Sequence, residues 1–401
     1  MGETPFYDDL ETRSADAREA AQLDILRAQV AAVRAAQDNC LPEDVVLTSL
    51  ADLAALPVLR KSDLAAWQKD KPPFGGIPVQ NVAHVFQSPG PIYEPGGVTH
   101  DWWRMGRFVH ALGIGPGDIV QNCFGYHLTP AGMIFESGAR AVGAAVLPAG
   151  TGQTELQVQA AVDIGTTAYA GTPDYLKVIL DKADEMGMSP GITRAAVSGG
   201  ALFPAMRQEY ADRGISCLQC YATADLGNIA YESPAMEGMI VDEGVIVEIV
   251  TPGTGVPVPA GEVGEVVVTA LNPDYPLIRF ATGDMSAVLP GVSPCGRTNM
   301  RIKGWMGRAD QTTKIKGMFV RPEQVAALVA RHVEIDRARV IADRDGAQDT
   351  MTVQIEAAGG DPAAFAESVV AVLKMKAGVE VVAPGSLPRD GLVIEDRRTY
   401  D

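Results

Sequence analysis

Residues 118–124 read DIVQNCF, a short run rich in apolar residues, and four comparable runs follow it along the chain. These later runs occupy residues 144–150, 167–171, 195–200 and 217–223. Segments with the composition of helices separate them, so short strands alternate regularly with helices. This alternation is typical of a parallel β-sheet with crossover helices. The chain from residue 118 to residue 223 therefore predicts an α/β fold.

The regions on either side of this stretch have different patterns. Upstream, Ser14 is a candidate helix cap, and the apolar residues Leu23, Leu26, Val30 and Val33 follow it at helical spacing. We expect this helix to pack on the main domain. Downstream, β-rich segments at residues 244–250, 264–269 and 277–288 are separated by turns and contain no helix pattern. They predict an antiparallel β subdomain.

The last ninety or so residues predict a small α+β domain. Residues 313–320 have the pattern of a hairpin, a helix is expected to start at Pro322, and strands are expected near Ala338 and Met351. A further helix is predicted over residues 362–376, and the APGSLPRDG segment at residues 383–391 is the most linker-like. We place a large N-terminal domain at residues 1–309 and a small C-terminal domain at residues 310–401.

Composition limits the classes of partner. The 401 residues are 47% hydrophobic, which suffices for a large core, and carry a formal net charge of -17. This charge disfavours nucleic acid and anionic membranes as partners. The chain has no long apolar run, and its first residues are acidic and polar, so we expect a soluble, cytoplasmic protein. Five cysteines without dense spacing predict free thiols.

Three motifs occur in a fixed order: YATAD at residues 221–225, RFATGD at 279–284 and GRADQTTKIKG at 307–317. They resemble the aromatic-Gly-x-[ST]-[DE], Y-R-T-x-D and G-R-x-D-D-x-I-K-x-R-G signatures of adenylate-forming enzymes. Four further stretches are similar to phenylacetate-CoA ligases, and with them the resemblance covers nearly the whole chain. They are ETRS at 11–14, LADLAALPVLRKSDL at 50–64, GTPDY at 171–175 and PCGRT at 294–298.

The resemblance implies a reaction and its cofactors. Such enzymes bind ATP and an acid, form an acyl-adenylate with loss of pyrophosphate, and then rotate the small domain so that coenzyme A attacks the adenylate. It implies ATP or AMP, Mg²⁺ and coenzyme A as cofactors, a mobile C-terminal lid, and a small carboxylate or an acyl-CoA as ligand. Relatives of this kind are often dimers, so a homodimer is one expectation.

Five motif residues suit nucleotide chemistry. Asp284 offers two acceptor oxygens to a ribose diol, with a turn-capping aspartate as the alternative. Tyr221 can stack on adenine or be a half-buried core tyrosine. Thr223 and Asp225 are expected near the α-phosphate or its metal ion. Arg308 presents a donor fork to ribose or phosphate oxygens, with a surface ion pair as the alternative.

The resemblance assigns the remaining roles. It places Ala222, Ser198 and Gly199 in the nucleotide site, the hinge at Asp310, and Lys314, a catalytic candidate, with Lys316 and Gly317 at coenzyme A. The acyl pocket is expected at Tyr126, His127, Ala149 and Gly150. His127 is equally consistent with a histidine in the pocket wall and with a catalytic group.

The phosphate loop departs from the family pattern. Residues 88–95 read SPGPIYEP where the family has SSGTTGKP, so Ser88, Gly90 and Pro95 persist. The two new prolines lack N–H donors, and Glu94 puts a negative charge in place of the lysine. We therefore predict a weak grip on the triphosphate of ATP.

A second departure lies near the C-terminus. In PRDGLVIEDRR, at residues 388–398, Leu392 stands where the family has the lysine that bridges carboxylate and phosphate. Leucine cannot stabilise the charge that develops during adenylation. Arg389, Arg397 and Arg398 are candidate substitutes. An acidic residue expected after Gly199 is also missing.

A zinc site is not expected. Cys295 retains one thiol of a cluster that several relatives share, and Cys217 and Cys220 lie on a predicted strand, where residues three apart point to opposite faces. Structural zinc sites require four ligands.

Three functional hypotheses remain. The first is an AMP-forming acid-CoA ligase for a small carboxylate, of which an aryl acid is one option. The second is a ligase-fold protein that binds nucleotide, coenzyme A or acyl-CoA but has lost adenylation. The third is an enzyme that uses a preformed adenylate or thioester. An enzyme is favoured over a binding protein.

Overall fold

The structure, a computed structural model, describes residues 5–36, 41–88, 91–200, 202–309, 311, 313–315, 318–345, 348–390 and 392–398. The chain divides into two compact units. Unit 1 comprises Met1–Val247, Val268–Phe280 and Leu289–Gly304, and unit 2 comprises Glu248–Val267, Ala281–Val288 and Trp305–Asp401. The boundary predicted between residues 309 and 310 stays a prediction, and Asp310 lies outside the described residues.

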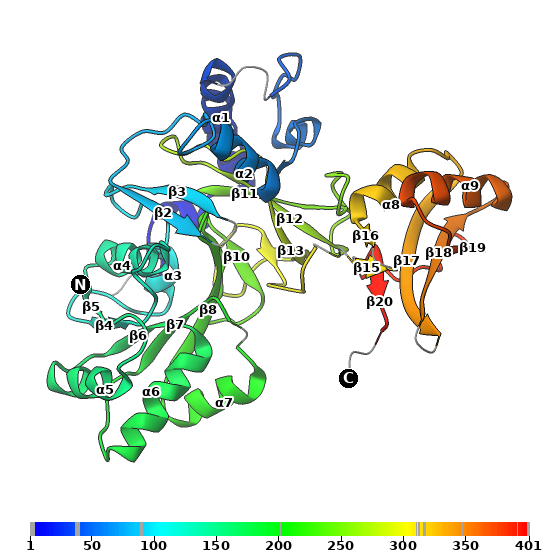
Figure 1. Cartoon of the computed structure of the whole chain (residues 1–401). Helices are drawn as coiled ribbons and strands as arrows, with labels where there is room; N and C mark the ends of the chain where they lie inside the picture. Colours follow the sequence, from blue (N-terminus) through cyan, green and yellow to red (C-terminus); the bar gives the residue numbers. More distant parts are fainter. Residues whose placement is uncertain are drawn as a thin grey trace. The chain divides into compact units, whose positions relative to one another are not determined.

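The predicted parallel sheet forms the centre of unit 1. Its strands pair in the order β8-β7-β6-β4-β5, and every pair among them is parallel. They are β4 (Ile119–Asn122), β5 (Ala145–Pro148), β6 (Ala168–Gly171), β7 (Arg194–Val197) and β8 (Ser216–Thr223). The crossover helices are α4 (Ala131–Ala141), α5 (Thr154–Asp163), α6 (Pro173–Glu185) and α7 (Pro204–Asp212). Figure 1 shows α5, α6 and α7 gathered along one side of these strands. The α/β prediction is confirmed.

The antiparallel strands continue the same sheet. Beyond β8 the order is β9 (Gly227–Tyr231), β10 (Met239–Val241) and β14 (Arg301–Ile302), all paired antiparallel. The predicted β-rich region forms β11 (Val245–Val250), β12 (Val263–Ala270) and β13 (Phe280–Leu289), which are neighbours in that order. The parallel and antiparallel parts therefore make one mixed sheet.

The N-terminal helices α1 (Ala15–Ala36) and η2 (Leu50–Ala55) of unit 1 share an apolar cluster. The other elements before β4, apart from a hairpin, are η1 (Asp9–Thr12), β1 (Leu59–Arg60), α2 (Lys61–Asp70) and α3 (Gly106–Ala111). The Ser14 hydroxyl accepts from the Ala17 N–H at 3.2 Å, and Leu26 and Val30 are buried beside Leu53. The predicted cap and apolar stripe of the first helix are confirmed.

Unit 2 contains the predicted C-terminal α+β fold. Its elements are β15 (Thr313–Ile315), β16 (Met318–Val320), α8 (Pro322–Val329), β17 (Ile335–Asp345), β18 (Gln348–Ala357), α9 (Pro362–Leu373), β19 (Gly378–Val382) and β20 (Ile394–Asp396). The main sheet has the order β19-β18-β17-β20, and α8 and α9 cover one face of it (Figure 1). Leu328, Val353 and Phe365 are buried between these layers.

Two details of unit 2 correct the sequence analysis. Helix α9 ends at Leu373, short of Lys376, because Lys374 adopts a left-handed φ of 59°. The linker-like segment is anchored, since the Leu387 N–H donates to Glu356 at 2.6 Å and Asp390 pairs with Arg339.

Of the helices in the described part of the chain, none combines the length and apolar character that a membrane-spanning helix requires.

Candidate functional site

The phosphate-loop segment forms an antiparallel hairpin that turns its acid inward. Strands β2 (His84–Ser88) and β3 (Ile92–Gly96) pair from His84↔Gly96 to Ser88↔Ile92. The Ser88 hydroxyl donates to the Glu94 carboxylate, and Glu94 is only 1% exposed. Gly90 lies outside the described residues. Glu94 therefore lies in a buried environment of unit 1, and its expected position beside a phosphate stays a prediction.

Asp225 is the second acid in this environment. It follows β8, its side chain is 2% exposed, and the Lys61 ammonium at the start of α2 donates to its Oδ2 at 3.1 Å. Burial, followed by the charge of Asp225, raises the pKa of Glu94 well above its usual range. Two carboxyl groups thus face a single lysine, and we name Ser88, Glu94, Asp225 and Lys61 the carboxyl pair cluster.

The carboxyl pair cluster contains polar atoms that lack a donor. Glu94 Oε2 and Asp225 Oδ1 are buried and have no hydrogen-bond partner among the described residues when both groups are ionised. A hydrogen bond between Glu94 and Asp225 forms only when one of them carries a proton, and it then favours the protonated form of Glu94. The Tyr275 hydroxyl is also buried and has no hydrogen-bond partner in the described part of the chain. Burial, then Asp225 and Glu94, raises the pKa of Tyr275.

The remaining unit 1 residues assigned to the nucleotide lie directly after β7 or on β8. The Ser198 hydroxyl donates to the Cys220 carbonyl at 3.0 Å, which joins the end of β7 to β8. A register shift between Tyr221 and Ala222 interrupts the pairing of β8 with β9. Thr223 accepts from the Leu226 N–H at 3.2 Å, and Gly199 has a φ of 70°. Tyr221 is buried, which suits a core tyrosine, so its stacking on adenine stays a prediction.

Unit 2 holds the residues assigned to the ribose. Arg308 Nη1 donates to Asp284 Oδ1 at 2.9 Å, and the Trp305 indole N–H donates to the same oxygen at 3.2 Å. The Asp284 side chain is 12% exposed, and the Arg308 side chain is 58% exposed. A Cβ atom on Gly283 would lie 2.9 Å from the Arg308 guanidinium, so glycine allows this close approach. The sequence analysis named both residues, and the observed ion pair is the alternative that it gave for Arg308, so their contact with a ribose stays a prediction.

Two of the four residues predicted for the acyl pocket, Tyr126 and Gly150, share a hydrogen-bonding partner. Asn122 donates to the Tyr126 hydroxyl at 2.8 Å, and its carbonyl accepts from the Gly150 N–H at 2.9 Å. Tyr126 donates to Glu136 at 3.1 Å, and burial, then Glu136, raises the pKa of Tyr126. Ala149 precedes Gly150 after β5, whereas the His127 side chain is exposed. The ends of β4 and β5 thus place Tyr126 and Gly150 around Asn122, whereas the exposed His127 side chain lies outside this group.

The predicted C-terminal site residues lie in unit 2 or outside the described structure. Lys314 belongs to β15 by its backbone, and Asp310, Lys316 and Gly317 lie outside the described residues. Leu392 lines a cavity of about 360 Å³ together with Val258, Val325, Val329 and Val393. Leucine at this position therefore suits its mainly apolar neighbours.

The three arginines proposed to replace the missing lysine have acidic partners. Arg389 pairs with Glu262, and Arg397 pairs with Glu395 at 2.7 Å. Arg398 pairs with Asp349 at 2.8 Å and with Asp396 at 2.7 Å. All of these contacts lie within unit 2. An arginine that replaced the lysine would first have to leave its carboxylate.

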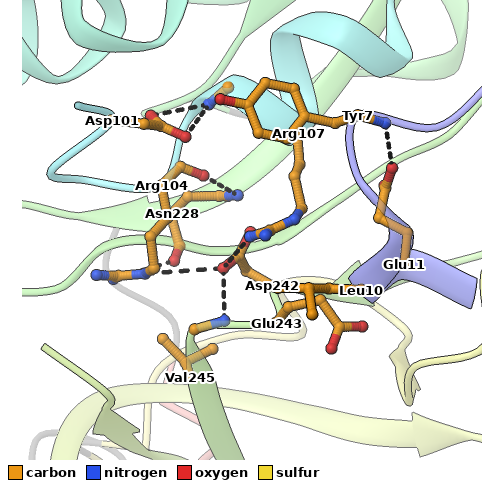
Figure 2. Close-up of polar contacts among 12 residues, drawn as sticks. Tyr7, Leu10, Glu11, Asp101, Arg104, Arg107, Asn228, Asp242, Glu243 and Val245 are labelled. Atoms are coloured by element: carbon orange, nitrogen blue, oxygen red, sulfur yellow. Dashed lines mark hydrogen bonds and ion pairs between the residues drawn. The ribbon is translucent and has the colours of Figure 1, made fainter. Parts of the chain in front are cut away.

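The ETRS and PCGRT stretches meet in a buried ion network. Arg297 of PCGRT pairs with Glu11 of ETRS, and both side chains are almost fully buried. Arg13 and Arg18 both pair with Glu243, at 2.7 and 2.9 Å. Figure 2 shows the neighbouring contacts in which Arg107 and Arg104 face Asp242. This network joins the N-terminal segment to the sheet, so these two motifs have a structural role.

Two residues of interest escaped the sequence analysis. Lys61 lies within the LADLAALPVLRKSDL stretch, which served only to mark a resemblance, and Trp305 lies two residues before Gly307, where the GRADQTTKIKG motif starts. Proximity to a motif was a usable signal for Trp305. No signal in the sequence pairs Lys61 with Asp225, 164 residues away.

Comparisons with known proteins agree with the sequence analysis. No profile of a known protein family matches the chain. The chain is 32% identical to a phenylacetate-coenzyme A ligase of Aromatoleum evansii over 334 residues, which cover 79% of this chain and 74% of that protein. It is 30% identical to the phenylacetate-coenzyme A ligase of Escherichia coli (strain K12), covering 79% of this chain and 75% of that protein.

A solved structure with the same fold is that of 2-hydroxyisobutyryl-CoA ligase in the postadenylation state in complex with 2-HIB-AMP. Its TM-score is 0.72 at 25% identity, and the match covers 99% of this chain and 94% of that one. The fold and the sequence relationship lead to the same assignment. The chain belongs to the phenylacetate-coenzyme A ligase family.

Proposed function

We propose that this chain is an AMP-forming acid-CoA ligase-like enzyme that handles the acyl-adenylate of a small carboxylic acid and transfers the acyl group to coenzyme A. An aryl acid is one candidate, in keeping with the relatives named phenylacetate-coenzyme A ligase. ATP or AMP, Mg²⁺ and coenzyme A are the corresponding cofactors. The proposal includes a cytoplasmic location and a homodimer, for which light scattering after size-exclusion chromatography is the test.

The pair of Asp284 and Arg308 carries this proposal. A mostly buried carboxylate with an adjacent exposed guanidinium offers acceptors to a ribose diol and donors to ribose or phosphate oxygens. Tyr221, Ala222, Ser198 and Gly199 are assigned to the base, and Thr223 and Asp225 to the α-phosphate side.

The roles assigned to other cofactors follow from residue chemistry. Asp225 and Glu94 are carboxylates of the kind that Mg²⁺ prefers, but Lys61 already pairs with Asp225. A metal ion would have to replace that ammonium group. Lys314, Lys316 and Gly317 are assigned to coenzyme A, and Tyr126, Ala149 and Gly150 to the acyl group. Asp310 is assigned to the hinge, for which limited proteolysis between residues 305 and 320 is the test.

The carboxyl pair cluster favours a second candidate function. Glu94 is buried near Asp225 where the family has a lysine, and Leu392 lines a mainly apolar cavity where the family has another. Without these two positive charges, activation of a carboxylate by ATP loses electrostatic stabilisation. The second candidate is an enzyme, or a binding protein, that takes a preformed acyl-adenylate or acyl-CoA.

One pair of assays separates these candidates. The chain is incubated with phenylacetyl-AMP and coenzyme A, and thioester formation is measured. ATP-pyrophosphate exchange is measured in parallel with a panel of carboxylic acids. Exchange together with thioester formation supports a complete ligase, whereas thioester formation alone supports the second candidate as an enzyme. If the chain neither forms the thioester nor binds AMP in equilibrium dialysis, the proposed function is wrong.

A further inference from the structure

The Asp284 carboxylate in unit 2 receives two side-chain donors on one oxygen. Besides Arg308, the Trp305 indole N–H donates to Oδ1 at 3.2 Å. Backbone bonds fix this arrangement, because the Met285 N–H donates to the Gly307 carbonyl at 2.9 Å. The segment around Arg308 thus runs antiparallel to the segment around Asp284. Trp305 is absent from the family signatures that identified Asp284 and Arg308.

The exposure of Trp305 is unusual for its size. The residue is 59% exposed, although its N–H is engaged with a carboxylate that is 12% exposed. A large aromatic surface left in water forgoes hydrophobic stabilisation of about 25 cal/mol per Å². Aromatic side chains that combine an exposed ring with an engaged polar group are enriched at binding surfaces. The ring is therefore available to a ligand that also reaches Asp284.

We propose that Trp305 is a positioning residue for a nucleoside monophosphate, and that its exposed indole ring covers the sugar of a nucleoside bound at Asp284. The indole N–H orients the carboxylate, so the sugar hydroxyls meet an acceptor of fixed direction. The carbon-bound hydrogens of the sugar pack on the ring face. This inference rests on the proposed function, because it requires an adenosine nucleotide at Asp284.

The fluorescence of Trp305 provides a direct test. The chain has four tryptophans, and Trp102 and Trp103 are buried while Trp67 is half-buried. AMP is titrated into the parent, Trp305→Phe, Trp305→Ala and the control Trp67→Phe, and fluorescence is recorded. Affinity is measured independently by equilibrium dialysis of AMP, and thermal unfolding shows whether each variant folds.

We expect AMP to change the emission of the parent and of Trp67→Phe, and to leave both Trp305 variants unchanged. Because Arg308 remains, Trp305→Phe should weaken AMP about threefold to tenfold, and Trp305→Ala should weaken it further. The loss caused by Trp305→Phe should vanish with 2′,3′-dideoxy-AMP, which lacks the diol. A general structural role would weaken both nucleotides equally.

The outcomes distinguish the inference from the function on which it rests. If dialysis shows AMP binding to the parent but Trp305→Phe binds AMP equally well and the emission does not change, the inference fails and the nucleotide site stands. If Trp305→Phe weakens AMP and the dideoxy analogue to the same extent, the positioning role fails. If the folded parent binds no AMP, both fail.

Discussion

Two groups of buried charges in unit 1 differ in how they are balanced. In the buried ion network of the N-terminal segment, Glu243 faces Arg13 and Arg18. In the same network Asp242 faces Arg107 and Arg104, as Figure 2 shows. In the carboxyl pair cluster, Glu94 and Asp225 face each other and Lys61. Both groups are withdrawn from water, where an unbalanced charge is costly. Opposite charges hold the first together, whereas the second contains a repulsion between its two acids.

This difference separates a structural group of charges from a candidate functional one. A network in which Glu11, Asp242 and Glu243 each have a cationic partner fixes the N-terminal segment and requires no ligand. Buried carboxyl oxygens that lack a donor carry a cost that a stable fold tends to avoid, and such groups concentrate at functional sites. The carboxyl pair cluster also lies on two segments assigned to the nucleotide. Substitutions in the two groups should therefore have opposite effects on stability.

The largest effect is expected from Glu243→Ala in the ion network. The substitution leaves Arg13 and Arg18 without their carboxylate, and unpaired buried charges cost about 3–5 kcal/mol. Urea unfolding at pH 7 should show a free energy of unfolding that is lower by a corresponding amount. Glu237→Ala is the matched control, because Glu237 is exposed and its pair with Arg301 should contribute about 1 kcal/mol or less. Equal losses in the two variants would remove the distinction between the regions.

A smaller effect of opposite sign is expected from Glu94→Gln. The pKa of Glu94 is raised in the folded chain, so its contribution to stability is full below the ordinary glutamate pKa and is lost as the pH rises through the raised value. Glutamine keeps the acceptor for Ser88 and carries no charge. We expect a gain on the order of 1–2 kcal/mol at pH 9 and little change at pH 4.5. Destabilisation at pH 9, with the exposed Glu155→Gln as control, would mean that the two acids do not repel each other.

The smallest effect is the coupling between neighbouring residues, and its sign is informative. In a double-mutant cycle of Glu94→Gln and Asp225→Asn, Asp225→Asn should increase the free energy of unfolding less in the Glu94→Gln variant than in the parent. In a cycle of Arg18→Met and Glu243→Gln, Glu243→Gln should decrease the free energy of unfolding less in the Arg18→Met variant than in the parent. Couplings of about 1 kcal/mol are typical of contacting residues. Chemical unfolding of all variants at pH 8 measures both, and a shared sign would contradict the comparison.

Much of the fold was accessible from sequence because its signals are local. The alternation of strands and helices over residues 118–223, the cap at Ser14 and the helix start at Pro322 depend on neighbours within a few positions. The end of α9 was misplaced by a few residues, since the left-handed backbone at Lys374 has no strong sequence signature. The pair of Asp284 and Arg308 was accessible because each belongs to a recognisable motif.

The rest of the site depends on long-range contacts. The hairpin register buries the Glu94 side chain, and only the folded chain places Asp225 and Lys61 in its surroundings. The same holds for the pairing of Glu11 with Arg297 across 286 residues. A single sequence without aligned relatives contains no record of such pairs, so these contacts could not be predicted.

The central proposal is that the chain keeps the family's nucleotide site but lacks two positive charges that activation by ATP requires. The most direct measurement is ATP-pyrophosphate exchange with phenylacetate in the parent, Glu94→Lys, Leu392→Lys and the double variant. One preorganised charge contributes about 3 kcal/mol, or roughly a hundredfold in rate. We predict the lowest rate in the parent and a higher rate in Leu392→Lys, and the double variant should exceed both single variants if positions 94 and 392 face the same phosphates. A parent that already turns over at roughly 1–1,000 s⁻¹, as ordinary enzymes do, would contradict the claim.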